Sequence, residues 1–179
     1  MFSAGTDPSE AGLRTTLSPE KGNNTGVSDM APVREQIILT TQPKPVKKIG
    51  HIYTPSEANS VTMKNMAQAA CDELGIELLL TTVTNTSEVK QAAEVLASKV
   101  DAIYISNDNT VVAALTGVTS TADRYNIPVV SADPSSAPVS GVAIAYGIDN
   151  YQTGRATGKV IAELLEGKTP EELPVKVQN

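Results

Sequence analysis

The sequence predicts an α/β domain with a doubly wound parallel sheet and helices on both faces. From residue 47 onward, short apolar segments alternate with helical segments, and the connections between them are short. This alternation favours parallel strands, because right-handed crossovers place helices over both faces of a sheet. The expected strands are residues 49–53, 77–83, 101–106, 127–132 and 142–147. Their polar and apolar residues do not alternate cleanly, which is typical of strands buried on both faces.

The helices are predicted from the spacing of their apolar residues and from signals at their ends. They are expected at residues 60–74, after Asn85, at residues 109–125 and at residues 151–165. Gly75 and Gly167 are stop signals for two of them. Asn85 and Glu88 have the spacing of a capping box.

The first 45 residues carry weaker signals. A short helix is expected at residues 9–17, a short extended piece at residues 25–28, and a helix at residues 31–41. The last of these is weakened by its β-branched residues and is ended by Pro43.

The composition excludes several classes of partner. The chain has 179 residues, a net charge of −6, a pI near 4.8 and no run of five basic residues. We therefore expect no nucleic-acid partner, because phosphate binding requires a basic patch. No stretch reaches the roughly eighteen apolar residues of a membrane span. The N-terminal residues have neither the basic nor the apolar region of a secretion signal, so we expect no signal peptide in this chain.

Cofactors and metals are not expected. The single Cys71 and the single His51 exclude an internal disulfide and a cysteine or histidine cluster for zinc. Cys71 lies in an Ala-rich helical stretch, where a buried apolar role is favoured, and His51 lies within a strand, where a core or helix-facing position is favoured. Neither GxGxxG nor GxxxxGK[ST] occurs, so nucleotide cofactors lack support.

Candidate binding groups lie in the loops after the predicted strands, because ligands of doubly wound sheets bind at the carboxyl ends of the strands. These loops are residues 54–60, 84–86, 106–110 and 132–136. Short polar side chains dominate all four, as helix capping alone would require. For residues 84–86 capping is the favoured interpretation.

The loop at residues 54–60 offers a site for an anion. Asn59 and Ser60 open a helix, so free backbone N–H groups and the positive end of the helix dipole face outward. A ligand carboxylate fits such a position. The alternative interpretation is a plain helix cap.

The next two loops offer acceptors for a cation. Asp108 stands between Asn107 and Asn109, where a carboxylate and two amides can hold an ammonium group. The alternative is again a helix cap. Asp133 follows a strand and precedes Pro134, where a turn-forming side chain is the alternative.

Catalysis is a weaker interpretation of the same loops. Ser56 and Ser131 have no histidine partner except His51, which lies inside a strand. Glu57, Asp108 or Asp133 could form an acid–base pair, but no spacing requires one. We therefore predict that the chain is not an enzyme.

Several segments resemble the ABC-transporter substrate-binding proteins of the tryptophan/tyrosine type. Residues 49–60, IGHIYTPSEANS, are similar to the family's IGVIYNPGEANS. Residues 83–89, 100–104 and 108–112 continue the resemblance. Residues 146–151, with Gly154, Arg155 and Gly158, match the family's late segment. The resemblance extends from Phe2 to Val175.

The resemblance implies a type-1 periplasmic binding fold, in which two doubly wound lobes close on a small solute at their hinge without catalysis. By motif position, Glu57, Asn59 and Ser60 would face the carboxylate of the ligand. Asp108 and Asn109, next to Asn107, would face its amino group, and Asp133 would line the opposite wall. Thr6 and Asp7 match the last loop of the first lobe, and Asp149 lies at a crossover strand.

The resemblance also predicts the domain organisation. Residues 1–25 would be a remnant of the first lobe and hinge, residues 26–147 the ligand-binding second lobe, and residues 148–179 a crossover and a helix that returns to the first lobe. Most of the first lobe would lie outside this chain. The apolar stripe of the helix at residues 151–165 should then be exposed or packed elsewhere than on the main sheet. That stripe is Tyr151, Val160, Ile161, Leu164 and Leu165.

Thr54 and Ser56 replace the family's usual Asn and Gly, and His51 replaces an aliphatic residue.

The leading hypothesis is an extracytoplasmic solute-binding component of an ABC importer. Its partners would be permease subunits and an aromatic or related amino acid. The alternative is the effector domain of a transcription regulator with the same fold, although the chain has no basic helix-turn-helix segment.

Overall fold

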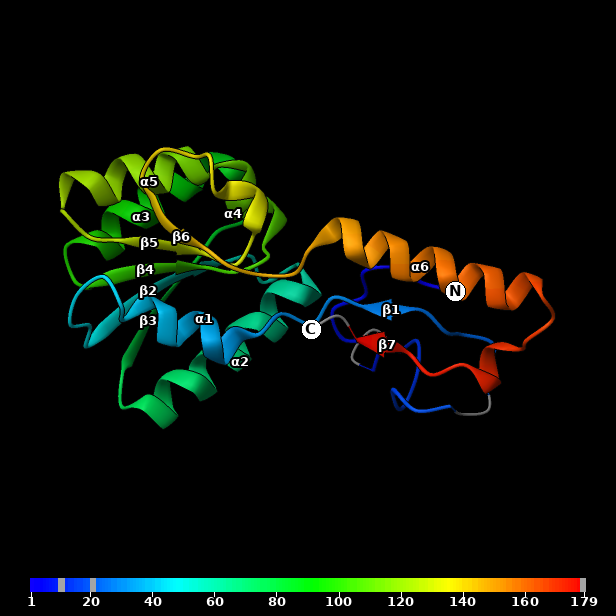
Figure 1. Ribbon diagram of the computed structural model, residues 1–179. Coiled ribbons are helices and arrows are strands. Elements are labelled where there is room, and N and C mark those ends of the chain that lie inside the picture. The colour runs from blue at the N-terminus through cyan, green and yellow to red at the C-terminus, as the bar shows by residue number, and fades with distance from the viewer. Residues whose placement is uncertain (10–11, 20–21, 178–179) are drawn as a thin grey trace. The chain divides into compact units, whose positions relative to one another are not determined.

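The chain forms two compact units in a computed structural model, which describes residues 1–9, 12–19 and 22–177 (Figure 1). Pro32–Gly147 make up one unit, called here the sheet unit. Met1–Ala31 and Ile148–Asn179 make up the other, called here the terminal unit. The chain therefore changes unit twice, after Ala31 and after Gly147.

The sheet unit is built on five parallel strands in the order β3-β2-β4-β5-β6. The strands are β2 (Lys48–Tyr53), β3 (Glu77–Thr82), β4 (Ala102–Ile105), β5 (Val129–Ser131) and β6 (Val142–Ala145). After β2 the chain runs outward to β3 and then returns past β2 to β4. The strand order therefore reverses between β2 and β4, where doubly wound sheets form their ligand crevice.

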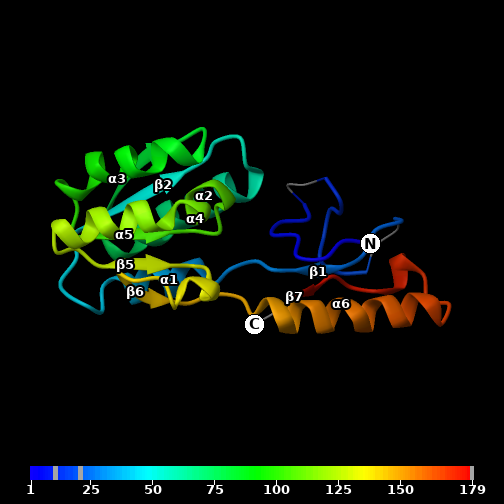
Figure 2. The same ribbon diagram turned by 90° about the horizontal axis from the view of Figure 1, so that it is seen from above.

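Helices cover both faces of this sheet. They are α1 (Val33–Thr40), α2 (Ala58–Leu74), α3 (Val89–Ala97), α4 (Asn109–Ala113) and α5 (Leu115–Arg124), with single 3₁₀ turns at η1 (Thr86–Glu88) and η2 (Pro134–Ser136). Figures 1 and 2 show α1 and α2 on one face and α3 and α5 on the other. The doubly wound parallel sheet predicted from the sequence is confirmed.

The core of the sheet unit is aliphatic. Ile52, Ile103, Ile105 and Val118 are fully buried in one continuous cluster. β3 differs from the expectation of strands buried on both faces, because it lies at the edge of the sheet. Its Leu80 is 40% exposed.

The helix expected at residues 109–125 is divided into α4 and α5. Ala114 leaves the helical conformation, with φ −114° and ψ 20°. Two i to i+3 bonds, from the Ala114 amide to the Val111 carbonyl and from the Gly117 amide to the Ala114 carbonyl, replace the regular pattern. The run of β-branched residues at 110–112 lowers helix propensity just before the break.

The terminal unit has a small sheet and one long helix. β1 (Val27–Ser28) pairs in parallel with β7 (Lys176–Val177), and α6 (Asn150–Leu165) packs beside them. Val160 is fully buried against Val27 and Leu173. Residues 26–31 therefore belong with this compact unit, because β1 pairs with β7.

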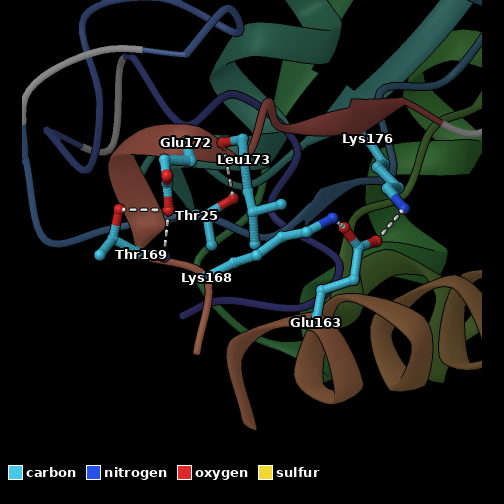
Figure 3. A network of polar contacts seen from close by, with 7 residues as sticks. All are labelled: Thr25, Glu163, Lys168, Thr169, Glu172, Leu173 and Lys176. Carbon is cyan, nitrogen blue, oxygen red and sulfur yellow. Dashed lines mark hydrogen bonds and ion pairs between the residues drawn. The ribbon is translucent and has the colours of Figure 1, made fainter. Parts of the chain in front are cut away.

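Hydrogen bonds hold the two ends of the chain together within the terminal unit. Figure 3 shows the Glu163 carboxylate of α6 between Lys168 and Lys176. Its oxygens lie 2.7 Å from Lys168 Nζ and 3.1 Å from Lys176 Nζ. The Thr25 hydroxyl donates to the Leu173 carbonyl at 3.2 Å. The buried Arg14 guanidinium donates to the carbonyls of residues 18, 24 and 173.

The helix expected at residues 9–17 is not formed in its described part. Gly12 has φ +67°, and the amides of Leu13 and Arg14 both donate to the Pro8 carbonyl, which makes a turn. Residues 10–11 lie outside the described residues.

The apolar stripe of α6 is divided between buried and exposed residues. Val160 is fully buried and Leu164 is partly buried in the terminal unit's own cluster. Tyr151, Ile161 and Leu165 are 71%, 44% and 83% exposed. The expectation that much of this stripe is exposed or packed elsewhere than on the main sheet is confirmed.

Candidate functional site

The two loops at the strand-order reversal are joined by the Glu57 side chain. Glu57 lies in the loop after β2, and its carboxylate accepts bonds from the backbone and side chain of Asn109 and of Thr110 at 2.7–3.2 Å. Partial burial opposes ionisation, but these hydrogen bonds outweigh it and lower the pKa of Glu57. Glu57 therefore occupies the N-terminus of α4.

Asp108, in the loop after β4, joins the same two loops through bonds to the loop after β2. Its fully buried carboxylate accepts from the Thr54 amide at 2.7 Å, the Thr54 hydroxyl at 3.0 Å and the Ser60 hydroxyl at 2.5 Å. It also caps α4 by accepting from the Val111 amide at 2.9 Å. These contacts use both carboxylate oxygens to hold the β2 loop against the β4 loop.

Asn59 and Asn107 add a third link. The side-chain Nδ2 of Asn59 donates to the backbone carbonyl of Asn107 at 2.6 Å. The side-chain oxygen of Asn107 is buried and has no hydrogen-bond partner among the residues that the structure describes. Among the described residues, the Asn107 side-chain oxygen is therefore an acceptor without a donor, at the carboxyl end of β4.

The N-terminus of α2 opens at the same place. Its N-cap residue, Glu57, turns its side chain to α4 and, as far as the described residues show, makes no side-chain cap bond to α2. Ala58 is exposed and Asn59 is half-buried. The first turn of a 17-residue helix thus presents its backbone donors and positive dipole end without a side-chain cap from its own N-cap residue.

The loop after β5 brings Asp133 beside these elements, since β5 neighbours β4. Asp133 is half-buried and caps η2, accepting from the Ser135 amide at 2.9 Å and the Ser135 hydroxyl at 2.6 Å. The three loops contain the acidic Glu57, Asp108 and Asp133 and neither lysine nor arginine. This part of the sheet edge is therefore rich in hydrogen-bond acceptors.

The remaining predicted site residues lie in the terminal unit. Thr6 donates to Asp29 at 3.1 Å, and Asp7 accepts from the Ser9 amide at 2.8 Å. Asp149 caps α6 by accepting from the amides of Tyr151 and Gln152. The structure thus brings together the seven predicted residues of the sheet unit and assigns these three to a separate unit.

A buried polar layer near the site was not predicted as part of it. Gln36 of α1 is fully buried and bonds to the Tyr104 hydroxyl and the Tyr146 carbonyl. His51 is also fully buried, as expected for a strand residue, and its Nδ1 lies 3.0 Å from the Tyr104 carbonyl. Burial lowers the pKa of His51 despite this contact. The signal that could have revealed Gln36 is its place on the apolar face of α1.

The described residues contain no group of three His, Cys, Asp or Glu side chains that could hold a metal ion. They also contain no helix that is both long enough and apolar enough to cross a membrane.

The family model for ABC transporter substrate-binding proteins matches residues 1–179. The chain belongs to this family. Its members bind substrates and are not enzymes, so the acid–base interpretation of Glu57, Asp108 and Asp133 is excluded.

Three known proteins compare closely with this chain. A tyrosine-binding protein of Clostridioides difficile (strain R20291) is 33% identical over 177 residues, which are 98% of this chain and 51% of that protein. A conserved domain protein of Vibrio cholerae has a TM-score of 0.91 and 36% identity, over 100% of this chain and 60% of that one. An ABC domain of Streptococcus pneumoniae in complex with L-Trp has a TM-score of 0.87 and 36% identity, over 98% and 59% of the two chains.

The chain therefore spans about half the length of this tyrosine-binding relative. A ribose operon repressor of Lactobacillus acidophilus is also similar, with a TM-score of 0.69 and 16% identity over 90% of this chain and 63% of that one. At that identity the likeness shows the fold alone. The fold is that of the type-1 periplasmic binding proteins.

Proposed function

We propose that the sheet unit is the ligand-binding second lobe of an extracytoplasmic solute-binding protein of an ABC importer, and that the solute is an aromatic or related amino acid. The observation that carries this proposal is the N-terminus of α2. It lies at the strand-order reversal without a side-chain cap from its own N-cap residue, next to loops whose side chains are mostly acceptors.

The carboxylate of an amino acid suits this helix N-terminus. Free N–H groups and the helix dipole together favour an anion at such a position. The neighbouring helix offers no equivalent place, because Glu57 already accepts from the amides of Asn109 and Thr110. Asn59 and Ser60 would border the bound carboxylate.

The ammonium group of the amino acid suits the acceptors of the next loops. Asn107 has a side-chain oxygen without a partner among the described residues, and Asp133 is half-buried. We infer that Asp108 acts on the ligand indirectly, because its buried carboxylate already accepts four hydrogen bonds. It would hold the two loops at the spacing that the ligand requires, with Asn109 kept in place by Glu57.

The ligands of similar proteins support the amino-acid class. One relative is a tyrosine-binding protein, and another was solved in complex with L-Trp.

The terminal unit would be part of the first lobe in this proposal. Thr6, Asp7 and Asp149 would belong to the far wall of the cleft. The exposed Tyr151, Ile161 and Leu165 of α6 would pack against further elements of that lobe. Permease subunits would be the partners of the whole protein.

Isothermal titration calorimetry with L-tryptophan, L-tyrosine and ribose tests the ligand class. Heat with either amino acid, reduced by Ala58→Pro, would support the proposal. This substitution removes a backbone donor from the first position of α2, where proline is well tolerated. Thr86→Pro, the same change at the first position of η1, is the matched control and should leave the heat unchanged.

Binding of ribose without either amino acid would contradict the proposed ligand class. Equal binding of L-tryptophan by the wild type and Ala58→Pro would contradict the assignment of the carboxylate to α2.

A further inference from the structure

The two points where the chain enters and leaves the sheet unit are joined by one buried side chain. The chain enters at Pro32, immediately before α1, and leaves after Gly147, just beyond β6. Gln36 lies in the first turns of α1, and its backbone N–H donates to the Pro32 carbonyl at 3.0 Å. Its side-chain Nε2 donates to the Tyr146 carbonyl at 2.8 Å.

The side chain of Gln36 is itself held in one orientation. The Tyr104 hydroxyl donates to Gln36 Oε1 at 2.6 Å, and both residues are fully buried. The Tyr146 carbonyl can only accept, so turning the amide over would bring Oε1 against it and lose that bond. Tyr104 stands on β4, so the contact links the middle of the sheet to the chain exit beyond β6.

The exit segment touches the ligand loop after β5. The Tyr146 amide donates to the Ser131 carbonyl at 2.9 Å. A Cβ at Gly147 would lie 1.9 Å from the Ala132 carbonyl oxygen, so the two backbones are in direct contact here. Asp133 follows Ala132 immediately. A shift of Tyr146 and Gly147 would therefore move the start of the loop that carries Asp133.

We propose that Gln36 is a positioning residue for ligand binding, which fixes the exit of the chain from the sheet unit and thereby the loop Asp133–Ser136. This inference rests on the proposed function for its effect on the ligand. The role of Gln36 in holding the exit segment stands apart from it and has its own readout.

Amide hydrogen exchange of the ligand-free chain, followed by NMR, tests that role. Gln36→Leu should speed exchange of the Tyr146 and Ser136 amides roughly five- to tenfold, the effect of losing one buried hydrogen bond. The Ile103 amide, which donates to the Pro128 carbonyl inside the sheet, reports on general loss of stability. Its exchange should change much less.

Thr40→Val is the matched control. The Thr40 hydroxyl is buried and donates to the backbone carbonyl of Gln36 at 2.8 Å, so this variant loses one hydrogen bond of α1 while leaving the contact with Tyr146 in place. It should affect all amides alike. Tyr104→Phe, which frees the Gln36 amide to turn, should reproduce the local effect of Gln36→Leu in a milder form.

Binding of L-tryptophan completes the test. Gln36→Leu should weaken binding several-fold, and Thr40→Val should not. Local exchange that is no faster in Gln36→Leu and Tyr104→Phe than in Thr40→Val would overturn the inference. If the wild type does not bind L-tryptophan but local exchange responds as described, the proposed ligand fails while the anchoring role of Gln36 holds.

Discussion

Replacing the buried carboxylate of Asp108 by an amide should loosen the contact between the two site loops. In Asp108→Asn, one of the two oxygens becomes an NH₂ group. Each oxygen accepts one bond from a backbone amide, of Thr54 or Val111, and one from a hydroxyl, of Ser60 or Thr54. Either orientation of the new amide therefore leaves one backbone N–H facing a donor and makes one hydroxyl turn round to accept. Hydrogen bonds to a charged group contribute about 1.5–3 kcal/mol each. With part of this offset because an amide costs less to bury, we expect a loss of about 3 kcal/mol.

Urea unfolding followed by far-ultraviolet circular dichroism measures this loss. The midpoint should fall while the slope stays constant, since the surface exposed on unfolding is unchanged. Asp133→Asn is the control. Among the described residues, its half-buried carboxylate accepts side-chain hydrogen bonds from Ser135 alone, so the substitution should cost less than about 1 kcal/mol. Equal midpoints for Asp108→Asn and Asp133→Asn would refute the idea that Asp108 joins the two loops.

Three further predictions concern pH and backbone space. Hydrogen bonds lower the pKa of Glu57 in the folded chain. Wild type should therefore be about 1 kcal/mol more stable than Glu57→Gln above pH 4.5, and this difference should disappear as the pH falls below 4.5. A difference in stability that does not depend on pH would contradict this. Burial lowers the pKa of His51, so the free energy of unfolding of wild type, measured by urea titration, should fall below about pH 6.5 by up to about 1.4 kcal/mol per pH unit. His51→Val should remove that part of the fall, and an unchanged pH dependence in this variant would contradict the assignment to His51. Gly147→Ala should destabilise the folded chain by about 1–3 kcal/mol, because the added Cβ meets the Ala132 carbonyl oxygen. Gly154→Ala, on an open helix surface, should stabilise it by up to about 1 kcal/mol. The opposite order of melting temperatures would show that the contact at Gly147 is relaxed at no cost.

The order of strands and helices in the sheet unit follows from local patterns, and these could be predicted. The capping signals at Gly75 and Asn85 are used as expected, with Gly75 in the left-handed region at φ +69° and Asn85 accepting from the Ser87 amide. The loops at the carboxyl ends also follow from the order of elements alone.

The internal contacts of the site could not be predicted, because they join residues far apart in the sequence. Glu57 caps a helix that begins 52 residues later, and Asp108 bonds to Thr54 across a similar distance. A sequence motif shows that each loop is polar, but not which of its side chains form hydrogen bonds with the other loop. The burial of Asp108 is the reason for proposing that it holds the loops and does not contact the ligand itself.

Gln36 shows a pattern that was available but easily passed over. Val33, Gln36, Ile37 and Thr40 share the buried face of α1. A polar side chain on such a face requires a buried partner, since an unpaired amide there is costly. The identity of that partner depends on the pairing of β4 with β5 and of β5 with β6.

Mapping L-tryptophan onto the chain by ¹H–¹⁵N NMR tests the central claim most directly. The account predicts that the largest shift changes, as L-tryptophan is added, fall on the backbone amides of Ala58, Asn59 and Ser60, with smaller changes at Asn107 and Asp133. Changes that leave those three α2 amides unmoved, or no change at saturating L-tryptophan, would contradict it.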